Sequence, residues 1–434
     1  ILASRIEIPK KSGMLLTNRR EQIIASEWIA FHLANEHHLG DRTFNLVDIF
    51  AGAGDVRSKE FRLQSSLQAE AKAEALWRKH QLTDAKVIGF HIGASRSNKA
   101  WAPQKFKSVI QHLLDTTDNQ IVLFGGYNEI GLKDDFQDIS STRFTDLIGE
   151  SNLDELIALV RRVDLFVTND TGPMHIAAAT CCKILNLSLG PVSFWETGPY
   201  IDGAFIMQAD IDCHPCSFSK SCYHQRCHEI ITPDAVCRTI IAIMGEQPLP
   251  PIDGVLTWKA GRDIFGLMHA LPTAKRPIRP REFLFECKRA VWAMTLLKNL
   301  QPDTDWVKKY MQYLTTDYEL VPYADREILA ELESLQKQAT EYAAKLCEIA
   351  RESGGTKKSI DKIKTRWSSA KVIKDRMFAH SRQLDVVYDF YHYATFRETA
   401  ISSNGLQEQI RQTAAIYSNL SLQLTALTRI LKEK

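Results

Sequence analysis

An apolar segment that runs directly into a short polar turn and then into a small-residue helix constrains this chain most. Residues 165–168 predict a buried strand, residues 169–173 the turn, and residues 174–180 an Ala-rich helix. At the carboxyl end of a parallel strand, such a turn presents backbone N–H groups and the positive end of a helix dipole to an anion. The segment therefore predicts a phosphate site, and Gly172 allows a ligand to approach the main chain closely. The same turn residues are also common at ordinary turns and helix N-caps that bind no ligand.

The surrounding residues 86–246 alternate between strand and helix patterns. Strands are expected at residues 87–91, 120–124, 165–168 and 183–188, and helices at residues 103–114, 153–161 and from 174 to 180. Such alternation is typical of a parallel sheet covered by helices on both faces. The predicted fold class is α/β, with a doubly wound parallel sheet followed by an α-helical bundle.

Four short motifs in this region occur in a fixed order. They are residues 90–95 (Phe-His-Ile-Gly-Ala-Ser), 99–103 (Lys-Ala-Trp-Ala-Pro), 122–129 (Val-Leu-Phe-Gly-Gly-Tyr-Asn-Glu) and 169–175 (Asn-Asp-Thr-Gly-Pro-Met-His). Together they resemble the donor-binding half of glycosyltransferase family 9, which includes the lipopolysaccharide heptosyltransferases. The resemblance implies a GT-B-type fold and an inverting glycosyltransferase. No metal or other cofactor is expected to be required, because a cation and helix N-termini can stabilise the leaving group and no carboxylate pair suited to Mg²⁺ accompanies the phosphate loops. The sugar it suggests is heptose from ADP-heptose, transferred to a lipopolysaccharide core or a related surface glycan.

The predicted donor site follows from the residues and from this resemblance. The loop after the first strand offers backbone N–H groups and a hydroxyl to a diphosphate, and Lys99 adds a point charge. The resemblance assigns Lys99 to stabilisation of the leaving group, Glu129 to the ribose, and the residues around the signature turn to the diphosphate and sugar. The full predicted set is Gly93, Ala94, Ser95, Lys99, Glu129, Asp170, Thr171, Gly172 and His175.

Three of these side chains also have a plainer interpretation. Lys99 is compatible with a solvated surface lysine, Glu129 with a loop carboxylate, and His175 with a packing residue, but their occurrence together favours the donor site. Within the donor site we expect His175 to hydrogen-bond a phosphate or hydroxyl rather than to abstract a proton. Trp101 is expected to pack beneath the loop rather than to stack on a nucleobase.

The catalytic base is not identified from the sequence. Family members use an acidic residue in a glycine-containing loop after the first strand of an N-terminal domain, and displace the donor directly with inversion. Here residues 1–85 are short for such a domain and are expected to be its remnant. Asp55 follows Gly54 but comes after a helix-like segment, so it is a weak candidate. The opening Ile1 suggests a fragment or processed form.

Nine cysteines are present, four of them clustered in one segment. The spacing of Cys213, Cys216, Cys222 and Cys227 fits a tetrahedral structural zinc site, an iron–sulfur cluster, reduced thiols without metal, or disulfides. The remaining five, Cys181, Cys182, Cys237, Cys287 and Cys347, are expected to be buried.

Beyond residue 246 the character of the chain changes. The prolines of residues 247–282 predict an extended linker, and residues 283–434 predict a helical domain. Residues 324–352 and 406–431 carry apolar side chains at alternating steps of three and four, which indicates packed antiparallel helices. This domain is expected to contact another copy or another protein. Contact with an anionic membrane surface is the less favoured alternative, and it would use the basic residues Lys357, Lys358, Lys362, Lys364 and Arg366.

Composition limits the partners. A formal net charge of +2 predicts no nucleic-acid binding, and no run of about 18 apolar residues is present to span a bilayer. We expect a cytoplasmic protein, with contact at the inner membrane left open. The partners are a nucleotide-sugar donor and a glycolipid or glycan acceptor. An alternative function is a nucleotide-sugar-binding or scaffold protein without transfer activity.

Overall fold

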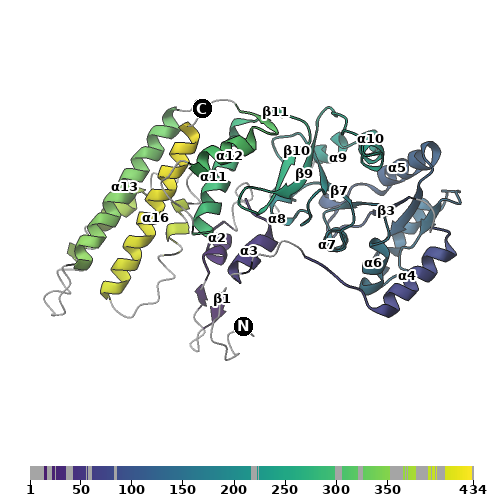
Figure 1. The fold of residues 1–434 in the computed structure, drawn as a ribbon, viewed down its shortest axis with the longest axis horizontal. Coiled ribbons are helices and arrows are strands. Elements are labelled where there is room, and N and C mark those ends of the chain that lie inside the picture. The colour runs from purple at the N-terminus through teal and green to yellow at the C-terminus, as the bar shows by residue number, and fades with distance from the viewer. Residues whose placement is uncertain are drawn as a thin grey trace. The chain divides into compact units, whose positions relative to one another are not determined.

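The computed structural model describes most of the chain and divides it into two compact units (Figure 1). The sheet unit comprises Phe44–Asp48 and Ser58–Arg276, and the helical unit comprises Ile1–Thr43, Ile49–Arg57 and Pro277–Lys434. The residues described are 14–16, 22–24, 26–35, 43–54, 56, 61–82, 86–216, 222, 224–298, 305–320, 326–351, 365–366, 368, 370–377, 390–391, 393–395, 397 and 406–432.

The sheet unit is built on an eight-stranded sheet with the order β10-β9-β8-β7-β6-β3-β4-β5. Its strands are β3 (Val87–His91), β4 (Gln120–Phe124), β5 (Phe144–Asp146), β6 (Leu165–Asn169), β7 (Ile184–Ser188), β8 (Phe205–Ala209), β9 (Val255–Arg262) and β10 (Met268–Pro272). Strands β3 to β8 are parallel, whereas β9 and β10 are antiparallel. The predicted parallel sheet is confirmed, but β5 and β8 were not among the predicted strands.

The direction of winding reverses between β3 and β6. From β3 the chain moves outward through β4 to β5, and from β6 it moves the opposite way through β7 to β8. Both strands pair in parallel, with Ile88 opposite Leu165 and His91 opposite Thr168. At such a switch point the connections leave the carboxyl ends of the strands toward opposite faces, and a crevice remains between them.

Helices cover both faces of this sheet (Figure 1). They are α4 (Leu67–Lys79), α5 (Pro103–Thr116), α6 (Leu153–Val160), α7 (Gly172–Ala179), α8 (Phe194–Thr197), α9 (Arg226–Ile230) and α10 (Pro233–Met244), with the 3₁₀ segments η2 (Ser97–Lys99) and η3 (Tyr127–Phe136). The predicted helices at 103–114, 153–161 and 174–180 are confirmed within one or two residues. Helix α5 packs on α10, and α4 packs on α6.

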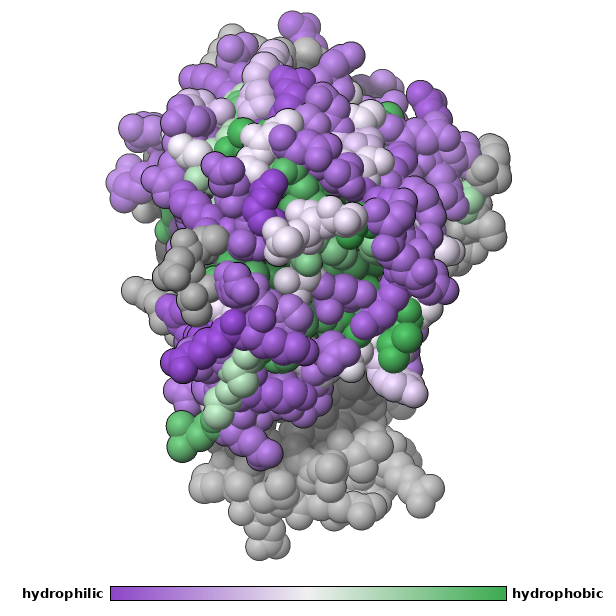
Figure 2. All heavy atoms as spheres, turned by 90° about the vertical axis from the view of Figure 1, so that its right-hand side faces the viewer, coloured by the Kyte–Doolittle hydropathy of each residue, from purple (hydrophilic) through white to green (hydrophobic). Residues whose placement is uncertain are grey.

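The core of the sheet unit explains why these elements form. The central strands β3, β6 and β7 are buried at every position, as expected for strands covered on both faces. On α5, buried Phe106, Val109, Ile110 and Leu113 recur at helical spacing and form one apolar stripe. The outer surface on the right-hand side of Figure 1 is mostly hydrophilic, with apolar side chains in small areas (Figure 2).

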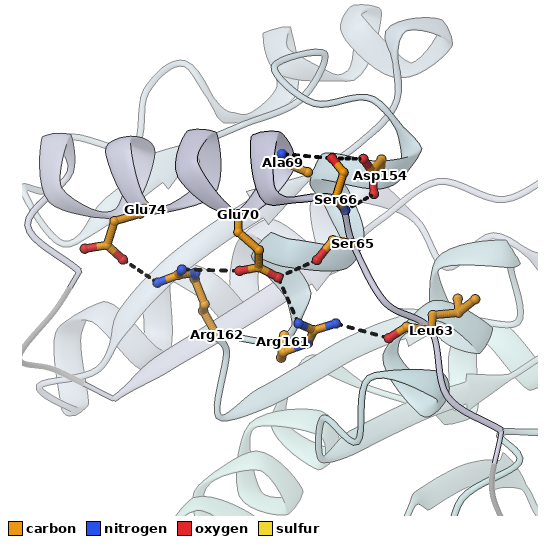
Figure 3. A network of polar contacts seen from close by, with 9 residues as sticks. All are labelled: Leu63, Ser65, Ser66, Ala69, Glu70, Glu74, Asp154, Arg161 and Arg162. Atoms are coloured by element: carbon orange, nitrogen blue, oxygen red, sulfur yellow. Dashed lines mark hydrogen bonds and ion pairs between the residues drawn. The ribbon is translucent and has the colours of Figure 1, made fainter.

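A polar network fastens α4 to α6 and to the turn that follows α6 (Figure 3). Ser66, the N-cap of α4, donates from Oγ to Asp154 Oδ2 at 2.6 Å and from its backbone N–H to Oδ1 at 3.0 Å. Glu70 on α4 accepts from Arg161 at 2.8 Å and from Arg162 at 3.5 Å. Helix α4 thereby supports α6, the helix whose first turn lies beside the crevice.

Residues 247–282, expected as a linker, contain a β-hairpin in the structure. Strand β9 extends the sheet beside β8, with Trp258 opposite Ile206, and β10 pairs with β9. The prolines do not interrupt this ladder, because Pro248, Pro250 and Pro251 precede β9 and Pro272 ends β10. The sheet unit therefore extends to Arg276 rather than ending near residue 246.

The helical unit takes most of the remaining described residues. Its elements are β1 (Met14–Leu16), β2 (Gln22–Ile24), α2 (Glu27–Asn35), α11 (Pro280–Leu296), α12 (Asp305–Leu314), β12 (Tyr318–Glu319), α13 (Arg326–Arg351) and α16 (Leu406–Lys432). Two elements lie at the division between the units, α3 (Leu46–Ala53) and β11 (Arg276–Pro277). Buried Trp292 of α11 stacks on Phe390 at 4.6 Å and meets Phe31 of α2 edge-on at 4.9 Å. Residues 1–85, expected as one remnant domain, are thus shared between the two units.

Helices α13 and α16 form the predicted antiparallel pair. Thr340 Oγ1 and Ser421 Oγ lie 2.7 Å apart, and the rings of Tyr342 and Tyr417 pack edge-to-face at 4.7 Å. The predicted apolar positions from Leu332 to Ile349 are buried against the partner helix. The four lysines of residues 357–364 lie outside the described residues. In the described part of the chain, no helix combines the length and the apolar character needed to cross a bilayer.

Candidate functional site

A cavity of about 540 Å³ opens at the switch point of the sheet. It is lined by residues from the loops after β3 (94–99), β4 (125–129) and β6 (170–175), from the start of α6 (151–156), and by His91 and Thr197. Every predicted site residue except Gly93 lines this cavity. The structure therefore brings together side chains that are up to 81 residues apart, between Ala94 and His175.

Asn169, the last residue of β6, connects to the segment after β3 through hydrogen bonds. Its amide Nδ2 donates to the carbonyl oxygens of Ile92 at 2.9 Å and Gly93 at 3.3 Å, and its Oδ1 accepts from the backbone N–H of Trp101 at 3.1 Å. Trp101 is fully buried and donates from Nε1 to the carbonyl of Ile231 at 3.1 Å. The prediction that Trp101 packs beneath the loop is confirmed, and this indole does not reach a ligand.

Lys99 and Asp170 form an ion pair in the wall of the cavity. The distance from Lys99 Nζ to Asp170 Oδ1 is 3.3 Å, and the side chains are 15% and 7% exposed. The second carboxylate oxygen, Oδ2, accepts from Thr197 Oγ1 at 2.9 Å. A solvated surface lysine does not fit this burial. The pair places one cation beside the first turn of α7, where an anionic ligand also meets backbone N–H groups.

Glu129 occupies the other side of the cavity, at the start of η3. Burial by itself would raise the pKa of this carboxyl, but the contact with His91 and the bond from the backbone N–H of Gly126 outweigh it and lower the pKa. Gly126 N lies 2.6 Å and His91 Nε2 lies 3.3 Å from Glu129 Oε2. A Cβ on Gly93 would lie 1.3 Å from Glu129 Oε1, so glycine is required there for this carboxylate to fit.

The first turn of α7 forms the end of the cavity nearest β6. Thr171 is the N-cap, and a Cβ added to Gly172 would meet nothing within 4 Å, so the main chain is open to a ligand at this point. The side chain of His175 lines the cavity about one helical turn after Gly172. The walls of the cavity desolvate its ring and lower its pKa, Lys99 lowers the pKa further, and Asp170 opposes both. His175 is therefore a neutral hydrogen-bonding group near pH 7.

The remaining wall is formed by the loop after β3 and by the start of α6. Ala94 and Ser95 line the cavity next to Lys99, as predicted. At the start of α6, Leu153 and Leu156 also line the cavity and give it an apolar surface. Asn152 caps α6 by accepting from the backbone N–H of Glu155 at 3.0 Å, which fixes the position of these leucines. The cavity thus combines charged side chains with an apolar wall at the start of α6.

Sequence reasoning did not assign several residues that line this cavity, among them the polar residues His91, Asn152 and Thr197. His91 carries a usable signal, because a polar residue at the carboxyl end of an apolar strand faces the ligand edge of a parallel sheet. Asn152 carries a weaker one, since Asn followed three residues later by Glu is a capping-box pattern. Thr197 lies 27 residues from Asp170 on a four-residue helix, and no local pattern marks it.

No catalytic base is identified in the described part of the cavity. Asp170 and Glu129 are its carboxylates, and both are held by neighbouring donors. Gly54 follows helix α3, as the sequence suggested, whereas Asp55 lies outside the described residues.

The clustered cysteines lie on the loop that follows β8 and on the start of α9. All nine cysteines are free thiols, so the disulfide alternative is not seen. Burial, together with the neighbouring thiols of Cys222, Cys227 and Cys213, raises the pKa of Cys216 to about 11. Among the described residues no group of three or more His, Cys, Asp or Glu is arranged to hold a metal ion, and residues 217–221 and 223 of this loop are outside them. The structural-zinc site stays a prediction.

The other cysteines were predicted to be buried, which is confirmed for Cys182, Cys237 and Cys287. The prediction is wrong for Cys181, which is exposed in the turn after α7, where its backbone is left-handed with a φ of 63°. Cys347 on α13 is partly exposed.

Comparison with known proteins identifies the family. The model of glycosyltransferase family 9 (heptosyltransferase) matches residues 1–228, which is more than half of the 434-residue chain. Lipooligosaccharide heptosyltransferase 2 of Campylobacter jejuni is 30% identical over 164 residues, covering 36% of this chain and 50% of that protein. Lipopolysaccharide heptosyltransferase 2 of Escherichia coli is 28% identical over 172 residues, covering 38% and 49%. The chain thus spans about half the length of the curated relatives it matches.

Solved structures also match. The E. coli ADP-heptose LPS heptosyltransferase II is 25% identical, with a TM-score of 0.35, covering 43% of this chain and 54% of that one. A family 9 glycosyltransferase of Veillonella parvula is 22% identical, with a TM-score of 0.41, covering 48% and 62%. The four motifs and the match of the family model over residues 1–228 lead to one conclusion: the chain belongs to glycosyltransferase family 9, the heptosyltransferase family.

Proposed function

We propose that this protein transfers a heptose from ADP-heptose to a lipopolysaccharide core or a related surface glycan. One observation carries the proposal. The cavity at the switch point combines a partly buried lysine, the first turn of α7 and an apolar wall, and these suit a diphosphate and a nucleoside. Membership of the heptosyltransferase family supports the same reaction class.

The departing diphosphate sets the main electrostatic demand of this reaction. The acceptor oxygen forms a bond to the anomeric carbon while the bond from that carbon to the phosphate oxygen breaks, and the electron pair leaves with the nucleoside diphosphate. Negative charge therefore develops on the phosphate oxygens. Lys99 and the N–H groups of α7 stabilise this charge without reorganising, because they are already fixed in the cavity wall. The proposal needs no metal ion or other cofactor.

The other side chains bind and orient the donor. Glu129 accepts from ribose hydroxyls, and the leucine wall at the start of α6 receives the base. The diphosphate and the sugar hydroxyls bind at the start of α7, to Asp170, Thr171, Gly172 and neutral His175. Attack from the face opposite the leaving group inverts the configuration at the anomeric carbon. The proton of the acceptor hydroxyl goes to an acidic residue that is not identified among the described residues.

Two further assignments belong to this proposal. The loop of Cys213, Cys216, Cys222 and Cys227 is assigned to a structural zinc ion, although these thiols, all among the described residues, are not arranged to hold a metal ion, so zinc binding would have to bring them together. The α13–α16 pair serves contact with another copy or another protein, ahead of contact with the inner membrane surface at which the acceptor resides.

Calorimetry with ADP and ADP-heptose, followed by mass spectrometry of a core acceptor after incubation with donor, tests the proposal. Donor binding and an acceptor heavier by one heptose are expected. Binding without transfer would favour the alternative, a nucleotide-sugar-binding or scaffold protein. Absence of binding to both nucleotides would overturn the proposal.

A further inference from the structure

His91 is a buried polar residue of the cavity to which the proposed reaction gives no task. It is the last residue of β3, and its side chain is 5% exposed. Its Nε2 lies 3.3 Å from Glu129 Oε2, whereas its Nδ1 is buried and has no hydrogen-bond partner among the described residues. Such an unpartnered buried nitrogen costs stability, and an apolar residue in this strand would avoid the cost.

The contacts of Glu129 show what His91 does. Oε2 receives both donors, Gly126 N at 2.6 Å and His91 Nε2 at 3.3 Å. Oε1 lies in the space that a side chain on Gly93 would occupy, and no described residue donates to it. One carboxylate oxygen is therefore held by the protein, and the other remains an acceptor for a ligand hydroxyl.

We propose that His91 is a positioning residue that fixes the Glu129 carboxylate and so makes the site selective for ribonucleotide over deoxyribonucleotide donors. The donor role requires a proton on Nε2, which leaves Nδ1 as the unpaired acceptor, in agreement with its surroundings. A carboxylate held at one oxygen points the other in a single direction, so the loss of one ribose hydroxyl leaves a buried acceptor unpaired. The inference rests on the proposed function, because it requires a nucleotide in this cavity.

The test compares the binding of ADP, 2′-deoxy-ADP and 3′-deoxy-ADP by calorimetry. The wild-type protein is expected to bind ADP at least about tenfold more tightly than one of the deoxy analogues. His91→Phe removes the donor but keeps the bulk of the ring, and should weaken ADP binding about tenfold while reducing the ribo-to-deoxy ratio to below about twofold. His91→Gln places an amide donor near the position of Nε2 and should restore most of that ratio. A residue that only packs in the core would not change the ratio.

Two further variants keep the test decisive. His91→Met is a second donor-free variant should the phenylalanine variant unfold, as circular dichroism would reveal. Glu129→Gln should abolish the same preference for ADP over the deoxy analogues. Combining it with His91→Phe should weaken ADP binding little further. An unchanged ribo-to-deoxy ratio in the donor-free variants that fold would overturn the inference while leaving the proposed function in place. Failure of the wild-type protein to bind ADP or ADP-heptose would instead overturn the proposed function, and this inference with it.

Discussion

Removal of the ammonium of Lys99 is the most direct perturbation of the proposed donor site. Lys99 is the last residue of η2, and Lys99→Met keeps an unbranched side chain with an apolar stem at this position. It deletes the charge that lies 3.3 Å from Asp170 Oδ1 and leaves that 7% exposed carboxylate facing the cavity without its counter-ion. The diphosphate then loses an attractive charge and meets a less compensated repulsive one.

The expected magnitude follows from the burial of this pair. A hydrogen bond to a charged group contributes about 1.5–3 kcal/mol, which corresponds to about 10- to 150-fold in a binding constant. We therefore expect Lys99→Met to weaken ADP binding, and to lower kcat/KM, by at least about tenfold. Asp170→Ala should also weaken donor binding about tenfold, because it removes the carboxylate that fixes the position of the Lys99 ammonium and that accepts from sugar hydroxyls in the proposed donor complex.

Lys183→Met is the matched control. Lys183 Nζ lies 3.3 Å from Glu246 Oε1, the same distance as in the Lys99 pair, but its side chain is 56% exposed and does not line the cavity. Exposed pairs contribute at most about 1 kcal/mol to stability and nothing to a distant site. Calorimetry with ADP should find unchanged affinity in this variant. Unchanged affinity in Lys99→Met, or an equal loss in both variants, would refute the electrostatic reasoning.

Three further predictions address other parts of the sheet unit. Gly93→Ala places a Cβ where Glu129 Oε1 now lies and should weaken ADP binding about tenfold. Gly131→Ala is the control, because its Cβ would meet nothing within 4 Å, and it should leave ADP binding unchanged. Equal affinities of the two variants for ADP would contradict this prediction. Transfer assayed by mass spectrometry should persist in EDTA, and loss that Mg²⁺ restores would contradict metal-independent chemistry. Burial lowers the pKa of His214 to about 4, so the unfolded state binds a proton that the folded state excludes. The free energy of unfolding, measured in urea, should fall by up to about 3 kcal/mol as the pH drops from about 6.5 to about 4, and less in His214→Asn.

Local sequence patterns were sufficient to predict a large part of the fold. Strands β3, β4, β6 and β7 and helix α5 were predictable, because unbroken apolar runs and a helical apolar stripe each lie within one short window of sequence. The hairpin of β9 and β10 was not, since its neighbouring prolines suggested a connector. Whether a proline breaks a strand depends on whether its missing N–H falls on a ladder position, and that is decided by the pairing partner.

The sequence by itself determined which residues approach the cavity. Lys99, Glu129, Asp170 and His175 all lie at the ends of recognisable βα units, because ligand contacts in a parallel sheet come from the carboxyl ends of its strands. Only the tertiary structure decided how these groups are paired. The contacts of Asp170 with Lys99 and Thr197, and of Glu129 with His91, depend on the order of strands that are not adjacent in the chain. Strand order is set by the packing of the whole sheet, so no local window of sequence encodes it.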